Sequence, residues 1–160
     1  MRASDGGLYT RSIAFGERRL DLRACDGATD RDFIREETAL NIRPFYEGTY
    51  GWSEERAHQE PKHPEDYTMV VLAGETIGFF ALHDKPDCMY LGDIQLATKA
   101  RGAGIGTRLM AHIESMARAT GHRTMRLRVF HANRAAALYR RLGYVVETSD
   151  EHSAIMHKML

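Results

Sequence analysis

A glycine-rich loop between a strand-like run and a long amphipathic stretch constrains this chain more than any other feature. Residues 89–96 favour a strand whose odd-numbered side chains from Leu91 to Gln95 share one side. Residues 105–117 carry apolar side chains at spacings of three and four, and Gly121 ends that pattern. The sequence therefore predicts a strand, a loop and then a helix of about four turns.

The loop spans residues 101–108 and has glycine at positions 102, 104 and 106. Glycines let the backbone turn sharply and approach a ligand, while successive N–H groups and the N-terminus of the helix point at one anion. Arg101 and Arg108 add positive charge. These properties favour a phosphate site. The alternative is a turn whose glycines only satisfy backbone geometry.

Two common phosphate-binding motifs do not fit this loop. It lacks the Gly-Lys-Ser/Thr ending of a nucleoside-triphosphate P-loop, so no lysine is available for a terminal phosphate. Its glycines also depart from the offsets of the dinucleotide fingerprint. The nearby aspartates, Asp93 among them, precede the loop instead of following it by about twenty residues.

A second motif lies near the C-terminus. Residues 133–144 predict a short alanine-rich helix that ends at Gly143, after a β-like run at residues 124–130. Together the two segments resemble the GNAT superfamily of acetyl-coenzyme A-dependent N-acetyltransferases, in which an Arg/Gln-x-x-Gly-x-Gly/Ala loop precedes an Asn…Ala…Leu-Tyr…Leu-Gly-Phe/Tyr segment. The matching residues are Arg101, Gly104 and Gly106 in the first pattern and Ala135, Leu138, Tyr139, Leu142, Gly143 and Tyr144 in the second.

The element order along the chain is β-α-α-β-β-β-α-β-α-β-β, which is also the order that the resemblance implies. We expect an α+β GNAT fold at residues 18–160, with a mixed central sheet of six to seven strands and about four helices. Residues 1–17 are expected to form an N-terminal segment, partly disordered. A first helix at residues 31–42 would bury Phe33, Ile34 and Leu40 and end before Pro44. A second would run from Ser53 to about His58.

Charge and composition narrow the function. Lysine plus arginine and aspartate plus glutamate number 22 each, so no net field attracts nucleic acid and we expect no nucleic-acid partner. No apolar run approaches the length of a membrane span, and the N-terminus lacks the apolar centre of a signal peptide. This predicts a cytoplasmic protein without a membrane role. No His, Cys, Asp or Glu cluster has metal-ligand spacing, so we expect no metal.

The resemblance implies acetyl-coenzyme A as the co-substrate. Backbone groups of Ile94, Gln95 and Leu96 would hold its pantetheine arm. Its pyrophosphate would lie beside Arg101 against the loop amides, those of Gly102, Ala103, Gly104, Ile105, Gly106 and Thr107. Asn133 is a further coenzyme A contact in the family pattern, although it stands six residues before Tyr139, one fewer than the family spacing.

For catalysis, the resemblance makes Tyr139 the general acid that protonates the leaving thiolate; the alternative is a core aromatic with a satisfied hydroxyl. The glutamate that some family members carry on the strand before the loop falls on Tyr90 here. Candidates for the base are therefore Asp93, the nearest carboxylate, and His152, ahead of the last strand. His83, at a strand end, ranks after both.

In the family, the first helices and the final hairpin line the acceptor side. Candidate contacts with the acceptor are Tyr46, Tyr50 and Trp52, with Phe45 and His152, and core packing is their alternative role. The expected function is direct acetyl transfer, within a ternary complex, to a primary amine of a small molecule, peptide or protein. The alternative is a non-catalytic acetyl-CoA-binding sensor or partner-binding module. A homodimer is compatible with either function.

Overall fold

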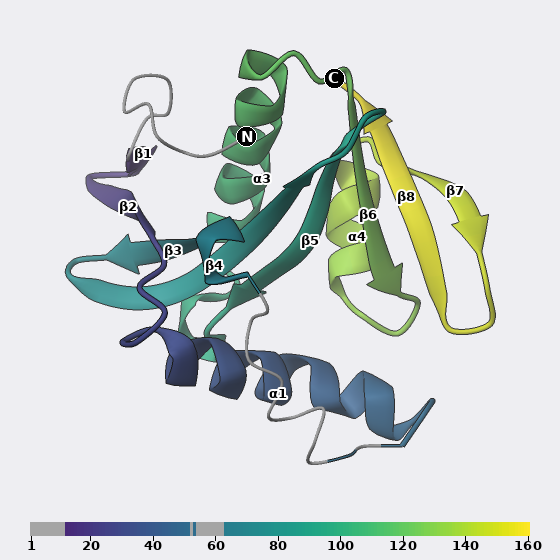
Figure 1. The fold of residues 1–160 in the computed structure, drawn as a ribbon, viewed down its shortest axis with the longest axis horizontal. Helices are drawn as coiled ribbons and strands as arrows, with labels where there is room; N and C mark the ends of the chain where they lie inside the picture. Colours follow the sequence, from purple (N-terminus) through teal and green to yellow (C-terminus); the bar gives the residue numbers. More distant parts are fainter. Residues whose placement is uncertain (1–11, 52, 54–62) are drawn as a thin grey trace.

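The protein is described by a computed structural model that covers residues 12–51, 53 and 63–160. Its described part contains eight strands and three α-helices around one sheet (Figure 1). The helices are α1 (Arg31–Glu47), α3 (Ile105–Ala119) and α4 (Ala135–Arg141). The strands are β1 (Ser12–Phe15), β2 (Arg18–Ala24), β3 (Tyr67–Leu72), β4 (Glu75–Asp84), β5 (Met89–Leu96), β6 (Thr124–Phe130), β7 (Val145–Ser149) and β8 (Ser153–Met159). Two short 3-10 turns, η1 (Pro64–Asp66) and η2 (Thr98–Ala100), complete the order.

The strands form a single sheet in the order β1-β2-β3-β4-β5-β6-β8-β7. Every neighbouring pair is antiparallel except β5 and β6, which run parallel because α3 connects them. Parallel neighbours need such a crossover connection. The one parallel pair lies inside the sheet and includes β5, the strand that precedes the glycine loop.

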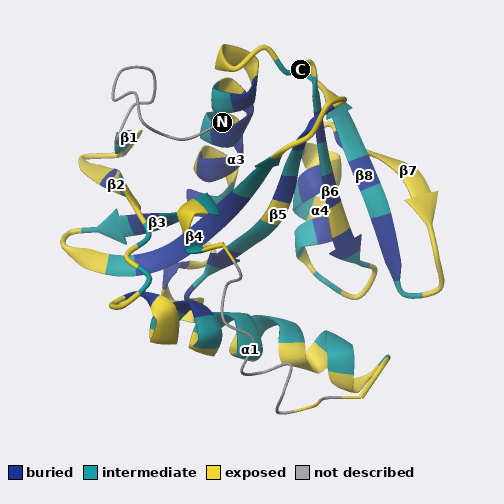
Figure 2. Ribbon diagram, viewed as in Figure 1, coloured by how far each residue is buried: buried dark blue, intermediate teal, exposed yellow. Residues whose placement is uncertain are grey.

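Two hydrophobic clusters cover the two faces of the sheet. The larger one joins the sheet to α3 and α4 and includes Phe80, Leu109 and Ile113. The smaller one joins the opposite face to α1 through Ile34, Met69 and Phe79. Adjacent residues Phe79 and Phe80 serve opposite clusters, as the alternation of a strand requires. The buried residues accordingly follow the central strands and the inner side of α3 (Figure 2).

The α+β GNAT-type architecture expected from the sequence is confirmed, with one strand more than expected. The extra strand is β1, whose residues Ser12–Phe15 belong to the expected N-terminal segment but pair with β2. The helix expected from Ser53 to about His58 falls almost wholly on residues 54–62 and lies outside the described residues. No helix in the described ranges is both long and apolar enough to cross a membrane.

Helix α1 differs from its prediction, because it continues past Pro44 to Glu47. Proline removes the hydrogen bond to the carbonyl of residue 40. That position faces outward, since the Leu40 side chain is 61% exposed, and the prediction that Leu40 is buried was wrong. The last turn is held from outside the helix, where Phe45 stacks on Phe130 of β6 with ring centroids 5.5 Å apart. Tertiary packing therefore overrides the local stop signal.

Two substitutions on α1 test this orientation. Ile34→Ala removes a side chain that is 3% exposed and should lower the free energy of unfolding by about 2–5 kcal/mol. Leu40→Ala should change it by less than about 0.5 kcal/mol, because that side chain already lies in solvent. Chemical denaturation of both variants measures the difference. Equal destabilisation would mean that α1 packs through a different face.

Candidate functional site

The sheet opens between β5 and β6. The two strands pair only through Met89–Met125, Tyr90–Arg126 and Leu91–Leu127. Beyond these residues β5 stays paired with β4 as far as Leu96, and β6 stays paired with β8 as far as Phe130. Figure 1 shows the two strands diverging from this short contact. The separated ends, residues 92–96 and 128–130, leave facing strand edges without a sheet partner on that side.

A β-bulge at Gly92 lies where the opening begins. The register between β4 and β5 steps from Ala81–Asp93 to Leu82–Leu91, so Gly92 is the extra residue. A bulge bends its strand and re-aims the side chains around it. As a result Leu91 joins the α3 cluster, whereas Gln95 faces α1. The sequence had placed these two side chains on one side, and the bulge makes that prediction wrong.

The glycine loop ends the opened part of β5 and starts α3. Gly102 and Gly104 adopt left-handed backbone conformations, with φ of 77° and 85°. The first helical hydrogen bond runs from the amide of Arg108 to the carbonyl of Gly104 at 3.2 Å. Among the described residues, the amides of residues 102–107 donate to no backbone carbonyl. Six consecutive N–H donors at the N-terminus of a long helix suit an anion such as a pyrophosphate.

Arg101 ties the loop to two other elements. Its Nε donates to the carbonyl of Leu96 at 3.0 Å, and its other guanidinium nitrogen donates to the side chain of Asn41 on α1. The guanidinium thus fixes the loop against the end of β5. From the sequence, Arg101 was predicted to add charge for a phosphate, and Asn41 was not predicted as a site residue. No local pattern marks Asn41, because its partners lie 54 and 60 residues away.

Asn41 continues a polar chain into the opening. Its Nδ2 donates to Oε1 of Gln95 at 3.0 Å, and Nε2 of Gln95 donates to Oδ1 of Asp93 at 2.8 Å. Burial raises the pKa of the Asp93 carboxyl, and the hydrogen bonds from Gln95 and the Ile94 amide offset this only in part. Two residues predicted for different roles, Asp93 and Gln95, are therefore joined in one network with the loop.

Tyr139 lies on α4, on the other side of the opening. Its side chain is 5% exposed, and its ring packs 5.8 Å from that of Tyr144. Burial, and after it the nearby charge of Asp93, raises the pKa of Tyr139 to about 12. The Tyr139 hydroxyl therefore stays protonated in the neutral range. Burial and the Glu114 carboxylate raise the pKa of the Tyr144 hydroxyl as well.

Asn133 has a structural role at the start of α4. Its Oδ1 accepts the amide of Ala135 at 2.9 Å, and its carbonyl accepts the amide of Ala136 at 3.0 Å. These bonds pair backbone N–H groups that have no acceptor within the helix at its N-terminus. A contact between Asn133 and coenzyme A stays a prediction.

The predicted acceptor contacts come together at the end of α1. Tyr46 packs against Phe130 of β6, with ring centroids 5.5 Å apart, and against Tyr50 at 5.8 Å. Tyr50 in turn meets the imidazole of His152 edge-on at 5.5 Å. The cluster of Phe45, Tyr46, Tyr50, Phe130 and His152 thus borders the open end of β6. Trp52 lies outside the described residues.

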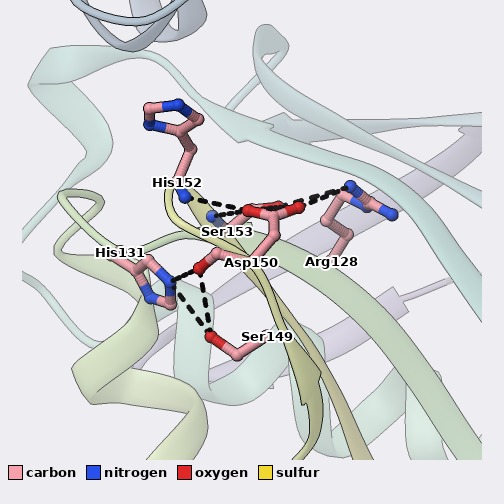
Figure 3. A network of polar contacts seen from close by, with 6 residues as sticks. All are labelled: Arg128, His131, Ser149, Asp150, His152 and Ser153. Carbon is pink, nitrogen blue, oxygen red and sulfur yellow. Dashed lines mark hydrogen bonds and ion pairs between the residues drawn. The ribbon is translucent and has the colours of Figure 1, made fainter.

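The turn between β7 and β8 positions His152. Both oxygens of Asp150 are engaged there, and Oδ1 accepts the amides of His152 and Ser153 at 2.8 and 2.7 Å. These bonds lower the pKa of the Asp150 carboxyl. Figure 3 shows the His152 ring directed away from that carboxylate, while His131 approaches the Asp150 carbonyl from the other side, at 2.9 Å. The turn therefore fixes the backbone of His152, while the His152 ring packs against Tyr50.

The position expected for the family glutamate, Tyr90, faces α1 rather than the α3 cluster. Its ring stacks on His83 of β4, with centroids 6.4 Å apart and planes 29° from parallel. No group of three or more potential ligands that could hold a metal ion occurs in the described ranges.

The model of the acetyltransferase (GNAT) family matches residues 33–144, a range that contains both the glycine loop and the segment at residues 133–144. A search of curated proteins gives no match. Among solved structures, the PaiA N-acetyltransferase from Thermoplasma acidophilum in complex with coenzyme A is similar with a TM-score of 0.73 and 20% identity, covering 88% of this chain and 99% of that chain.

Two further structures have the same fold. An acetyltransferase from Thermus thermophilus has a TM-score of 0.69 at 16% identity, with 88% of this chain and 97% of that chain covered. N-acetylglutamate synthase from Neisseria gonorrhoeae, complexed with coenzyme A and N-acetyl-glutamate, has a TM-score of 0.64 at 21% identity. That match covers 88% of this chain but 35% of the synthase chain.

A pair of glycine substitutions tests the loop. In Gly104→Ala, a side chain must adopt φ near 85°, which costs about 1–2 kcal/mol in the anion-binding conformation. Coenzyme A should therefore bind roughly 5- to 30-fold more weakly by calorimetry. Gly106→Ala is the control, since its Cβ would lie 3.5 Å from Leu138, an ordinary contact inside the protein. Equal affinities for the two variants would contradict the assignment of the loop.

Proposed function

The chain belongs to the acetyltransferase (GNAT) family, and we propose that it moves an acetyl group from acetyl-coenzyme A to a primary amine by direct attack in a ternary complex. The observation that carries this proposal is the row of six amides at residues 102–107 that have no backbone acceptor among the described residues and that follow the opened edge of β5 after one 3-10 turn. An anion site beside an opened strand suits an extended acetyl donor whose pyrophosphate binds the loop and whose amide-containing arm lies along the strand.

The residues present suit coenzyme A. The loop amides would hold the pyrophosphate, and the backbone of Ile94, Gln95 and Leu96 would bind the pantetheine arm along the edge that β6 does not cover. Because these amides are fixed by the fold, binding needs little ordering of side chains. Arg101 contributes by holding the loop, since its guanidinium already bonds Leu96 and Asn41.

Tyr139 is the proposed general acid. When the amine nitrogen attacks the thioester carbon, the carbon–sulfur bond breaks and coenzyme A leaves as a thiolate, which a nearby hydroxyl can protonate. A pKa of about 12 keeps the Tyr139 hydroxyl protonated throughout the neutral range. Its position across the opening from β5 matches that role, because Asp93 of β5 is close enough for its charge to raise this pKa.

The aromatic cluster at the end of α1 is the proposed acceptor side. Tyr46, Tyr50 and His152 offer ring faces and edges at the border of the opening. Aromatic faces attract apolar groups and cations, and an amine acceptor is a cation before it loses its proton. Trp52 is a further proposed contact. The chemistry of the cluster therefore favours an amine with an apolar or cationic neighbouring group.

A non-catalytic acetyl-CoA sensor is the second candidate. It is favoured by one observation, the tyrosine at position 90 where some family members carry a glutamate. Incubation of the protein with acetyl-coenzyme A and a panel of alkyl amines, arylamines and lysine peptides separates the two candidates. Release of free thiol that depends on an amine supports the enzyme. Tight binding of acetyl-coenzyme A without release across the panel supports the sensor.

Replacing two adjacent buried tyrosines tests the acid. Tyr139→Phe should lower turnover by about 100-fold or more, because the thiolate loses its proton donor, while the affinity for acetyl-coenzyme A stays within about twofold. Tyr144→Phe is the matched control: it removes a buried hydroxyl beside Glu114 from the ring that packs on Tyr139. A turnover number unchanged by Tyr139→Phe would exclude this role.

A further inference from the structure

We propose that His83, oriented by Asp66, is the general base that takes a proton from the acceptor amine at the point where β5 and β6 separate. This inference rests on the proposed function and adds a general base, which the proposed function does not assign. An alkyl amine with a pKa near 10 is only about a thousandth neutral at pH 7, so its proton must be removed before the nitrogen can attack.

His83 lies on the α1 face of the sheet, beside the opening. The alternation of β4 places His83 on the same side as Phe79, which packs against α1. Its cross-strand partner is Tyr90, which is also one of the three β5 residues that pair with β6. The amine-binding cluster at the end of α1 lies on this face as well. The imidazole therefore lies on the same face as the expected acceptor side, at the end of the opening where β5 and β6 still pair.

Gly92 brings the imidazole to the opening. A Cβ built on Gly92 would lie 2.3 Å from Nε2 of His83 and 2.5 Å from its Cδ2. The ring edge thus rests directly on the backbone of the bulge, in space that any other residue would fill. Since Gly92 is the first residue of β5 beyond the pairing with β6, Nε2 lies at the start of the opening.

Asp66 holds the other side of the ring. Its Oδ2 lies 3.3 Å from Nδ1 of His83, so the carboxylate favours the tautomer with the proton on Nδ1 and stabilises the imidazolium once Nε2 accepts a second proton. In the described part of the chain, Nε2 has no hydrogen-bond partner. The His83 side chain is 37% exposed, which lets it return its proton to water.

Several other titratable groups on this face are already paired or protonated, whereas Glu37 of α1 and His157 of β8 each keep one buried polar atom without a hydrogen-bond partner in the described ranges. The Asp93 carboxylate accepts from Gln95, and burial raises the pKa of Tyr67 to about 12. Arg126, opposite Tyr90 on β6, is paired with Asp87 at 2.7 Å and with Glu147 at 2.8 Å. His152 packs on Tyr50 at the far end of the opening. Among the described residues of this face, His83 alone has a ring nitrogen without a hydrogen-bond partner, a carboxylate partner on its other nitrogen and a contact with the bulge.

The protons and electrons of the step balance. Nε2 of His83 takes one proton from the ammonium group, and the nitrogen lone pair forms the bond to the acetyl carbon while the carbon–sulfur bond breaks. Tyr139 donates its proton to the sulfur, and the second nitrogen proton, lost as the amide forms, restores the tyrosine hydroxyl. His83 then releases its proton to solvent. The products are the amide, the free thiol and one proton.

The test compares kcat/KM against pH for the wild-type protein and four variants, with thiol release as the signal and the best amine of the panel as the acceptor. His83→Gln should lower kcat/KM by about 100-fold or more and abolish the loss of activity on the acid side, because no imidazole remains to be protonated. Asp66→Asn, which keeps the shape of the site, should lower kcat/KM by a smaller factor, because the imidazole loses the carboxylate that orients its Nδ1. Acetyl-coenzyme A affinity should stay within about twofold in both.

His122→Gln is the matched control. His122 also pairs with an aspartate, at 3.0 Å from Asp84, which is the residue after His83 and faces the other way along β4. This variant should keep the wild-type profile. The inference is overturned if His83→Gln retains the wild-type kcat/KM and acid limb, or if Asp93→Asn abolishes that limb instead. A wild-type protein that releases no thiol with any amine overturns the proposed function itself, and the role of His83 with it.

Discussion

The bulge at Gly92 and the three-residue pairing of β5 with β6 set the geometry on which everything else in the molecule depends. Each strand is held on its outer side, β5 by β4 and β6 by β8, so neither can close the space between them. The bulge rotates the end of β5, which sends Asp93 and Gln95 toward α1 and leaves Ile94 and Leu96 packed against the α3 cluster. The opening is therefore part of the sheet itself and needs no movement to form.

The polar chain from Arg101 through Asn41 and Gln95 to Asp93 explains how the opening is held. It joins the glycine loop, α1 and β5 through side-chain hydrogen bonds. Hydrogen bonds within a partly buried chain strengthen one another, and a missing member leaves buried groups unpaired. The same residues thus position the anion cradle and set the charge that Tyr139 experiences, which links the donor side of the site to its acid.

The sequence predicted the features that depend on neighbouring residues. The strand at residues 89–96, the loop and α3 follow from local periodicity, and Gly104 has a left-handed φ that glycine adopts without a Cβ clash. The sequence did not predict the features that depend on contacts between residues far apart in the chain. Pro44 does not end α1, because Phe45 and Tyr46 pack on Phe130. No local sequence pattern marks the hydrogen bond between Asn41 and Gln95 or the β-bulge at Gly92 that turns later side chains to the other face of the sheet. Both features shape the candidate site.

The central claim is that the amides of residues 102–107 bind the pyrophosphate of acetyl-coenzyme A beside the opened edge of β5. Amide hydrogen exchange, measured with and without acetyl-coenzyme A, tests it most directly, because these amides have no backbone acceptor in the described part of the chain. The account predicts strong slowing of exchange confined to residues 102–107 and the opened end of β5, with little change when adenosine is added instead. Unchanged exchange in the loop at saturating acetyl-coenzyme A, or protection centred on another part of the chain, would contradict it.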